Sequence, residues 1–344
     1  MNILLTSAGR RTYLVHYFKE ALNMAGLDGQ IHAANSEASP AFSAADRQVV
    51  APLIYDRGYI PFLLDYCRKW EIKLLIPLFD IDLPVLSSHR EEFAAVGTLV
   101  ATADKEAIEI CNDKWKAYSV LTKIGIPTPR SWLDWEEAAR EAKNGTASYP
   151  FILKPRWGMG SLSVYQADND EELRVLDKKI RREIQNGYLK YEAAQDLGSC
   201  VLVQEKVCGR ELGMDVVNDL EGRYRMAVVK EKTAMRAGET DGAVTVERPL
   251  LAETGRRLSG LLKHRGNLDV DILESDGKWF VLEMNARFGG GYPFSHAAGL
   301  HLPYALVMWA AGKEPEARYL QARMGIRAQK DIRILALNSI SKEE

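Results

Sequence analysis

The sequence predicts an α/β protein in which a parallel sheet, covered by helices on both faces, precedes a second and mostly antiparallel unit. Residues 1–112 alternate short apolar runs with helix-length segments, an alternation typical of a doubly wound sheet. From about residue 150 the pattern changes to strand pairs joined by short turns. At roughly 150 residues per domain, the length of 344 residues favours two or three domains.

The N-terminal region contains five apolar runs that are expected to form buried strands. Apolar residues recur at helical spacing from Tyr13 to Ala25, so a strand-loop-helix unit opens the chain. No Gly-x-Gly-x-x-Gly follows the first strand, and the sheet therefore does not imply a dinucleotide site. The expected strands are Asn2–Ser7, Ile31–Ala34, Gln48–Ala51, Lys73–Leu78 and Thr98–Ala101, with further helices at Tyr59–Trp70 and Leu83–Val96.

A boundary is expected at Asp113, where a helical stretch to Ile124 is followed by prolines that cannot continue it. Beyond it, a hairpin precedes a charged, helical stretch with a break expected at Gly187. The hairpin strands are 151–155 and 162–166. The segments 201–207, 211–217 and 224–230 are expected to be successive strands of one antiparallel sheet. The remaining expected elements are a helix at 252–264 and strands at 268–273, 279–285 and 332–337.

The composition favours a small-molecule ligand over a nucleic acid or a membrane. Lys and Arg number 45 and Asp and Glu number 47, so the net charge of −2 leaves no broad basic field. The four cysteines are scattered, without the spacing of a zinc site. No apolar run approaches the roughly 20 residues that a bilayer requires. We therefore expect a reduced, cytoplasmic chain with no membrane or nucleic-acid partner.

A glycine-rich loop between two strand-like runs suggests a flap over phosphate groups. It runs from Lys154 to Ser161 and contains Gly158 and Gly160. The backbone N–H groups of such glycines can approach phosphate oxygens because no Cβ intervenes, and Lys154 adds a positive charge. An ordinary hairpin turn with a solvated lysine explains the same residues, so the loop alone leaves both interpretations open.

Two acids on consecutive predicted strands suggest a magnesium site. If a three-residue turn joins the strands, Asp271 and Glu283 share a face as diagonal neighbours roughly 7–8 Å apart, and Asn285 joins them. A four-residue turn would place the two acids on opposite faces. Arg287 follows at once, and a guanidinium beside Mg²⁺ suits the neutralisation of a transferring phosphate. A surface hairpin with one charged face is the alternative.

Three further charged residues stand at the ends of predicted strands. Arg10 and Arg11 follow the first strand, where the open ends of parallel strands form a ligand crevice, and could bind a substrate carboxylate. A solvated pair at a helix start is the alternative. Asp80 follows another strand and is expected either to contact a substrate amine or to cap its own loop. His296 and His301 are assigned no chemistry.

The order of these motifs resembles the ATP-grasp superfamily of carboxylate–amine ligases. The ordered elements are Lys114, the Lys154 loop, Gln204–Val207 followed by Gly209–Glu211, and Asp271 with Glu283–Arg287. The likeness is greatest to single-module relatives of the carbamoyl-phosphate synthetase large chain and to the ligase of pyrrolysine biosynthesis. It implies a Rossmann-like pre-ATP-grasp sheet domain followed by a two-lobed ATP-grasp module. The implied ranges are 1–112, 113–318 with a mobile lobe at about 130–203, and a C-terminal tail at 319–344.

The resemblance also implies which residues hold ATP and its metal. Lys114 and Lys154 are similar to the lysines that contact the α- and β-phosphates, beneath the flap of Gly158, Gly160 and Ser161. The resemblance assigns the hinge that contacts adenine to Glu205, Lys206 and Val207, and the acceptor of a ribose hydroxyl to Glu211. It assigns the magnesium ligands to Asp271, Glu283 and Asn285, with Glu283 bridging two ions. The same ligands would also bind Mn²⁺. It assigns the arginines that face the transferring phosphate to Arg287 and Arg236.

The function implied is an ATP-dependent ligase that forms an acyl-phosphate and joins it to an amine, with amino-acid-like substrates and release of ADP and phosphate. The sequence holds one grasp module, no glutaminase segment and no biotin-carboxylase-like lysine in the flap, which disfavours carbamoyl-phosphate synthesis and biotin chemistry. A kinase-like enzyme that releases its phosphorylated product is one alternative. A non-catalytic ATP-binding module is another. The resemblance is also consistent with a homodimer.

Overall fold

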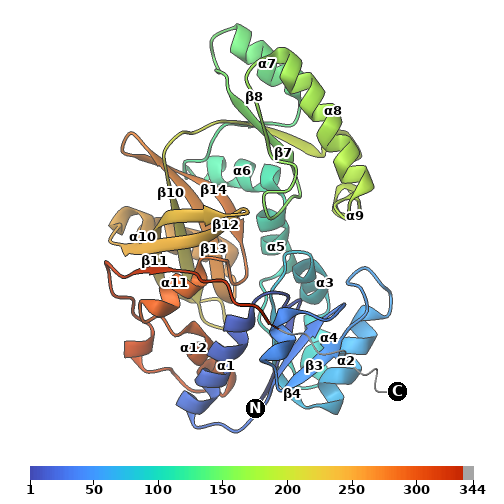
Figure 1. The fold of residues 1–344 in the computed structure, drawn as a ribbon, viewed down its shortest axis with the longest axis vertical. Helices are drawn as coiled ribbons and strands as arrows, with labels where there is room; N and C mark the ends of the chain where they lie inside the picture. Colours follow the sequence, from blue (N-terminus) through green and yellow to red (C-terminus); the bar gives the residue numbers. More distant parts are fainter. Residues whose placement is uncertain (336–344) are drawn as a thin grey trace.

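The computed structural model describes residues 1–335 and contains three β-sheets in that range (Figure 1). The first sheet is parallel and comes from the N-terminal region, and the other two are antiparallel. The predicted α/β class, with a sheet domain ahead of an antiparallel module, is confirmed. Short 3-10 helices occupy Pro40–Ser43, Leu197–Ser199 and Ala317–Tyr319. Within the described range, no helix has the length and apolar character needed to cross a membrane.

The N-terminal sheet has the strand order β3-β2-β1-β4-β5. Its strands are β1 (Asn2–Thr6), β2 (Ile31–Asn35), β3 (Arg47–Val50), β4 (Ile72–Pro77) and β5 (Leu99–Val100). One face is covered by α1 (Thr12–Ala25) and α12 (Leu302–Ala310), and the other by α2 (Tyr59–Lys69), α3 (Asp82–Ser88) and α4 (Arg90–Ala95). The single helix expected at 83–96 is therefore wrong, because His89 leaves helical backbone angles and divides it.

The strand order places a crevice at one edge of this sheet. The chain runs from β1 outward to β2 and β3, and then returns to β4 on the other side of β1. The loops after β1 and β4 therefore diverge at the carboxyl edge, which is where open α/β sheets bind ligands. Arg10 and Arg11 lie in the first of these loops and Asp80 lies in the second. The fold thus brings all three residues to the same edge.

The four-stranded sheet, in the order β6-β9-β7-β8, forms the upper lobe in Figure 1. Its elements are β6 (Ser131–Trp132), α7 (Trp135–Lys143), β7 (Phe151–Pro155), β8 (Tyr165–Ala167), α8 (Asp170–Asn186), α9 (Lys190–Ala193) and β9 (Val201–Glu205). The break at Gly187 is confirmed. The expectation that 201–207 shares a sheet with 211–217 is wrong. Strand β9 already pairs with β6 and β7 on its two sides, so the chain crosses to the next sheet after Glu205.

The six-stranded sheet has the order β14-β13-β10-β11-β12-β15. Its strands are β10 (Arg210–Asn218), β11 (Tyr224–Arg236), β12 (Glu239–Val246), β13 (Gly266–Ser275), β14 (Lys278–Asn285) and β15 (Arg327–Gln329). Helices α5 (Lys105–Asn112), α6 (Lys114–Lys123) and α10 (Pro249–Leu262) share a core with one face, and α11 (Tyr292–Ala297) packs on the other.

Two expectations about the later strands need correction. Strand β12 was not predicted, although the Ala-Val-Thr-Val run at its end has β-forming side chains. The strand expected at 332–337 is wrong in its described part, 332–335, and its last two residues lie outside the described residues. The final strand is instead β15, which pairs with the edge of β12.

Candidate functional site

The hairpin of β13 and β14 brings the predicted metal ligands onto one face by an unexpected route. Its turn has two residues, Asp276–Gly277, both with positive φ as a type I′ turn requires. The register beside this turn would set Asp271 and Glu283 on opposite faces. The register then shifts after Asp271, where Leu282 has no partner, and Asp271 comes to lie directly opposite Glu283. The three-residue turn and the diagonal placement are therefore wrong, while the shared face is confirmed.

A fourth polar residue extends this row, and sequence reasoning missed it. Asp269 lies opposite Asn285 and two residues before Asp271, so the period of a strand puts it on the same face. Burial, together with the charge of Asp271, raises the pKa of Asp269 to about 7. A Cβ at Gly289 would overlap the Asp269 carboxyl group, 2.0 Å from its carbon, so glycine is needed there. Its spacing of two residues from Asp271, which puts both side chains on one face of a strand, was the signal that could have revealed Asp269.

Lysines from two other elements lie against these acids. Lys114 Nζ, at the start of α6, is 3.0 Å from Glu283 Oε1, and Lys232 Nζ, on β11, is 2.7 Å from Asp271 Oδ1. Burial would raise the pKa of Glu283, but the charges of Lys114 and Lys154 outweigh it and hold that pKa below its usual value. Burial would lower the pKa of Lys232, but Asp271 raises it. Each of the two paired acids therefore has a lysine as its partner.

The donor atoms of this face fit a hard divalent cation. Asp271, Glu283 and Asn285 offer carboxylate and amide oxygens, the ligands that Mg²⁺ accepts in proteins. In residues 1–335, no three His, Cys, Asp or Glu side chains are grouped closely enough to enclose a metal. A cation held here would therefore take further ligands from water or from the oxygens of a bound molecule, as Mg²⁺ does with phosphates.

Arg287 connects this hairpin to the N-terminal sheet. Its Nη2 donates to Asp80 Oδ2 at 2.9 Å, and its Nη1 lies 3.4 Å from Asp269 Oδ2. Burial would lower the pKa of Arg287, but Asp80 and Asp269 raise it well above its usual value. The guanidinium thus stays charged and is held from two domains. Asp80, which the sequence assigned either to a substrate or to its own loop, belongs to the same cluster.

Lys154 lies at the base of the glycine flap and is almost fully buried. Its Nζ donates to Gln204 Oε1 at 2.8 Å. Burial, together with the positive charge of Lys114, lowers the pKa of Lys154 to about 8. Lys114 Nζ also donates to the carbonyl oxygen of Gly158, which joins the flap to the face that carries Glu283. The structure therefore brings Lys114, Lys154 and Glu283 together, as the motif order implied.

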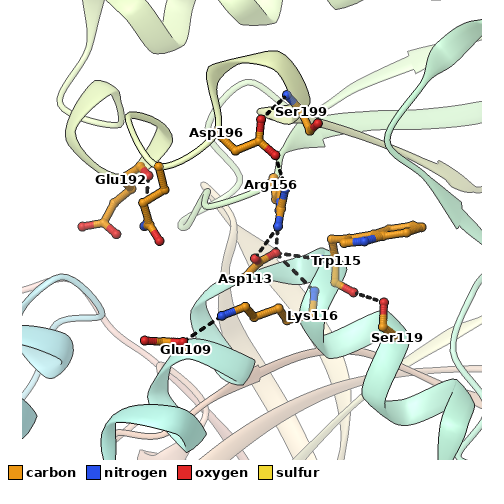
Figure 2. A network of polar contacts seen from close by, with 10 residues as sticks. Glu109, Asp113, Trp115, Lys116, Ser119, Arg156, Glu192, Asp196 and Ser199 are labelled. Atoms are coloured by element: carbon orange, nitrogen blue, oxygen red, sulfur yellow. Dashed lines mark hydrogen bonds and ion pairs between the residues drawn. The ribbon is translucent and has the colours of Figure 1, made fainter.

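The root of the flap is fixed by a polar network that the sequence analysis did not single out (Figure 2). Asp113 accepts hydrogen bonds from the backbone N–H groups of Trp115 and Lys116, and so caps α6. It also pairs with Arg156 through two hydrogen bonds of 2.7 Å. Arg156 reaches Asp196 at 3.3 Å on its other side. An acid just before a helical run is an N-cap signal that could have revealed Asp113.

The remaining predicted residues lie farther from this cluster. Glu205 is half-buried, and its Oε1 lies 3.8 Å from Arg130 Nη1. Lys206 is exposed and donates a hydrogen bond to Gln166. The cavity described below is not lined by Glu205, Lys206 or Val207. Glu211 joins the site through Lys232, at 3.6 Å. Arg236 pairs with Asp241 at 3.0 Å and is half exposed, outside the residues that line the cavity.

A cavity of about 1020 Å³ opens between the carboxyl edge of the parallel sheet, the flap and the six-stranded sheet. Its walls combine residues of the parallel sheet, the six-stranded sheet and the loops around them with flap residues and two tyrosines near α9. Among the predicted residues, those that line it are Arg10, Arg11, Asp80, Gly160, Ser161, Asp271, Glu283, Asn285 and Arg287. The cavity is large enough for a small organic molecule beside the carboxylates of Asp271 and Glu283.

Comparison with known proteins matches both halves of the chain. A model described as "PylC-like, N-terminal domain" matches residues 3–101, and one described as "ATP-grasp domain" matches residues 111–291. The arginine-specific carbamoyl phosphate synthase large chain of Geobacillus stearothermophilus is 23% identical over 281 residues, which are 79% of this chain and 25% of that one. This chain spans 18–25% of the length of the carbamoyl phosphate synthase large chains it matches first.

Solved structures share the fold at low sequence identity. A biotin carboxylase from Campylobacter jejuni, described as a β-γ-ATP complex, is 16% identical with a TM-score of 0.72, and the match covers 93% of this chain and 73% of that chain. An L-amino acid ligase from Bacillus licheniformis has a TM-score of 0.63 and 17% identity, and covers 93% and 77%. These likenesses establish the fold and extend over both the sheet domain and the module that follows it.

Proposed function

Because the chain belongs to the ATP-grasp family, we propose that it is an ATP-dependent carbon–nitrogen ligase. It would activate a carboxylate as an acyl-phosphate on Mg·ATP, join it to an amine as an amide, and release ADP and phosphate. The observation that carries this proposal is the direct pairing of Asp271 and Glu283 at the wall of the cavity. Lys114 contacts Glu283 from behind this wall, and Arg287 lines the same cavity.

In this proposal the chain's own residues bind and orient the nucleotide. Lys114 and Lys154 contact the α- and β-phosphates, and Glu211 accepts a ribose hydroxyl. The adenine lies against the hinge of Glu205, Lys206 and Val207. The flap residues Gly158, Gly160 and Ser161 close over the phosphates and keep water from the activated carboxylate.

Charged side chains in and around the cavity would stabilise the charge that develops in the reaction. Asp271, Glu283 and Asn285 would hold Mg²⁺, which neutralises charge on the phosphate oxygens. Arg287 and Arg236 would face the transferring phosphoryl group. A reaction of this type needs positioning and charge neutralisation more than a protein nucleophile. The cluster of Lys114, Lys154 and Arg287 suits that requirement.

The test is ADP release from Mg·ATP in mixtures of carboxylates and amines, compared between the wild type and Glu283→Gln. We expect ADP only when a matching acid and amine are both present, and at least a hundredfold loss in the variant, since one lost electrostatic contact of this kind costs about 10²–10³-fold. Glu274→Gln is the matched control. It changes an acid on the same hairpin whose partners, Arg210 and Arg248, lie outside the cavity lining.

Other outcomes would replace the proposal. A phosphorylated acid that accumulates without any amide would favour a kinase-like enzyme. Tight binding of Mg·ATP with no turnover in any mixture would favour a non-catalytic ATP-binding module. Equal rates in the wild type and Glu283→Gln would remove the metal-binding face from the reaction.

A further inference from the structure

The carboxyl edge of the parallel sheet forms one wall of the large cavity. The loops that follow four of its strands all contribute to this wall, and they cluster around the point where the strand order reverses. The contributing segments are Ser7–Arg11 with the exception of Ala8, Ala34–Ser36, Ala51–Asp56 and Phe79–Ile81. The opposite wall carries Arg287 and the cation-binding face. A ligand on the sheet edge would therefore lie against the phosphate-transfer site of the proposed function.

Asp80 presents an unsatisfied acceptor at this wall. The residue is 5% exposed, and Arg287 uses only one of its carboxylate oxygens, Oδ2. The other oxygen, Oδ1, is buried and accepts no hydrogen bond from residues 1–335. The nearby amide of Asn112 donates to the backbone carbonyl of Asp80 and not to its side chain. A buried carboxylate oxygen without a partner calls for a donor from a ligand, and an ammonium group best matches its charge.

The same crevice carries two positive charges without counterions. Arg10 and Arg11 line the cavity, and neither guanidinium takes part in an ion pair or a hydrogen bond within the described part of the chain. The other cationic side chains of the cavity are all paired. Lys230 contacts Asp215, Lys232 contacts Asp271, and Arg287 contacts Asp80. An anionic group of a ligand would therefore find its partners at Arg10 and Arg11.

The floor of the crevice is held by a hydrogen bond that involves none of Asp80, Arg10 and Arg11. Tyr59, which lines the cavity, donates to Asp82 Oδ1 at 2.6 Å. Asp82 also has an unpartnered oxygen, but it lies beneath the crevice and does not line it. Among the acidic residues that line the cavity, Asp80 is thus the one with an unsatisfied buried oxygen in the described part of the chain.

From these observations we propose that the crevice binds an amino acid, with its ammonium group on Asp80 and its carboxylate on Arg10 and Arg11. The inference rests on the proposed function, because it makes this amino acid the amine substrate. Asp80 shares Arg287 with the phosphate-transfer site, so the nitrogen would lie beside the activated carboxylate. After the ammonium group has given one proton to water, the amine would attack the acyl carbon, form the amide and displace phosphate. The carboxylate of the same molecule would point away from Arg287 and escape activation.

The binding test uses a panel of L- and D-amino acids, each paired with the acid that lacks only the amino group. Affinities are measured by calorimetry in the presence of Mg·ADP. We expect the wild type to prefer one or a few amino acids over their des-amino partners by roughly tenfold to a hundredfold, the value of a charge-assisted hydrogen bond. Asp80→Asn should abolish this preference, and Arg10→Ala with Arg11→Ala should abolish the preference over the corresponding amino-acid amides.

Asp56→Asn is the matched control, since Asp56 lines the same cavity but its Oδ1 already accepts from the N–H group of Gly58. It should retain the preference for the ammonium group. If Asp80 acts only by positioning Arg287, Asp80→Asn will lower the turnover with every amine alike and keep the preference for amino acids. That result would overturn the inference, as would equal affinity of the wild type for both members of every pair.

The two proposals fail in different ways. If ADP release requires an acid and an amine but no amino acid binds, the site assignment is wrong and the ligase stands. If a phosphate-bearing amine binds better than every amino acid, the carboxylate partner assigned to Arg10 and Arg11 is wrong. If amino acids bind with the expected preference and Mg·ATP is never turned over, the ligase is wrong and the crevice stands as a binding site.

Discussion

The β13–β14 hairpin and the glycine flap both face the proposed phosphates, but the fold prepares them to different degrees. In the hairpin, strand pairing puts the acids opposite each other, and ion pairs with Lys114 and Lys232 hold them. Beyond Pro155, where β7 ends, the flap lies in turns outside any strand, and its tip is exposed. Ser161 and Ser163 have positive φ, a conformation that non-glycine residues rarely adopt and that costs roughly 1 kcal/mol or more. The side chains of the hairpin are thus held in place by strand pairing and ion pairs, whereas the flap is held by few contacts beyond its root.

The largest effect is expected on the hairpin side. Asp271→Asn removes one carboxylate charge and leaves the buried Lys232 with only Glu211, at 3.6 Å. We expect ADP release to fall about 10²–10³-fold. Circular dichroism should be unchanged, because the strand pairing uses backbone groups. A loss below tenfold would mean that the paired acids are not the centre of the site.

The second effect concerns Lys154, at the junction of hairpin and flap. Its pKa of about 8 lies below the usual 10.5, so in the free protein it loses its charge as pH rises through 8, where an ordinary lysine stays protonated. The affinity for Mg·ADP should therefore weaken above pH 8, and binding at pH 8–9 should take up a proton as the phosphate restores the charge. Calorimetry in buffers of different ionisation enthalpy measures this uptake.

Lys154→Met is the corresponding variant. It should bind Mg·ADP roughly tenfold to a hundredfold more weakly at pH 7, and its affinity should no longer change with pH near 8. A pH profile of binding that is the same in the variant and the wild type would show that another group titrates in this range.

The third effect isolates the flap. Gly238, in the turn between β11 and β12, has a φ of 78°, and a Cβ on it would come within 2.8 Å of Ser161 Oγ. Gly238→Ala should displace the flap and lower turnover by up to about 10²-fold, since small misplacements near a reacting group have effects of that size. Gly260→Ala on α10 is the control, because no atom lies within 4 Å of its added Cβ. Turnover equal to the wild type in Gly238→Ala would show that flap closure does not limit the reaction.

The difference between hairpin and flap also explains what the sequence could predict. The element types and the parallel sheet followed from apolar periodicity, which the fold preserves from Tyr13 to Ala25 and in most strands. The shared face of Asp271 and Glu283 was predicted on the wrong turn, because the register shift at Leu282 depends on sheet packing and leaves no local signal. The contact of Arg287 with Asp80 joins residues 207 positions apart, and only the fold brings them together. Contacts between side chains that are distant in the sequence thus could not be predicted, because they depend on the tertiary structure.

The smallest effect on activity is expected at the root of the flap. Asp196 pairs with Arg156 at 3.3 Å and is half exposed, while Asp113 holds the same guanidinium with two shorter bonds (Figure 2). Asp196→Ala removes this half-exposed ion pair and the hydrogen bond from the N–H group of Ser199, so it should lower the free energy of unfolding by about 1–2 kcal/mol and leave the affinity for Mg·ADP unchanged. Urea unfolding and calorimetry measure the two quantities. Asp113→Ala is the comparison, since it leaves Arg156 buried without its main partner and should cost about 3–5 kcal/mol. A large loss of Mg·ADP affinity in Asp196→Ala, comparable to the loss of turnover in Gly238→Ala, would contradict this prediction. It would mean that the root of the flap is as easily displaced as its tip, and that the whole loop is less firmly held than the hairpin.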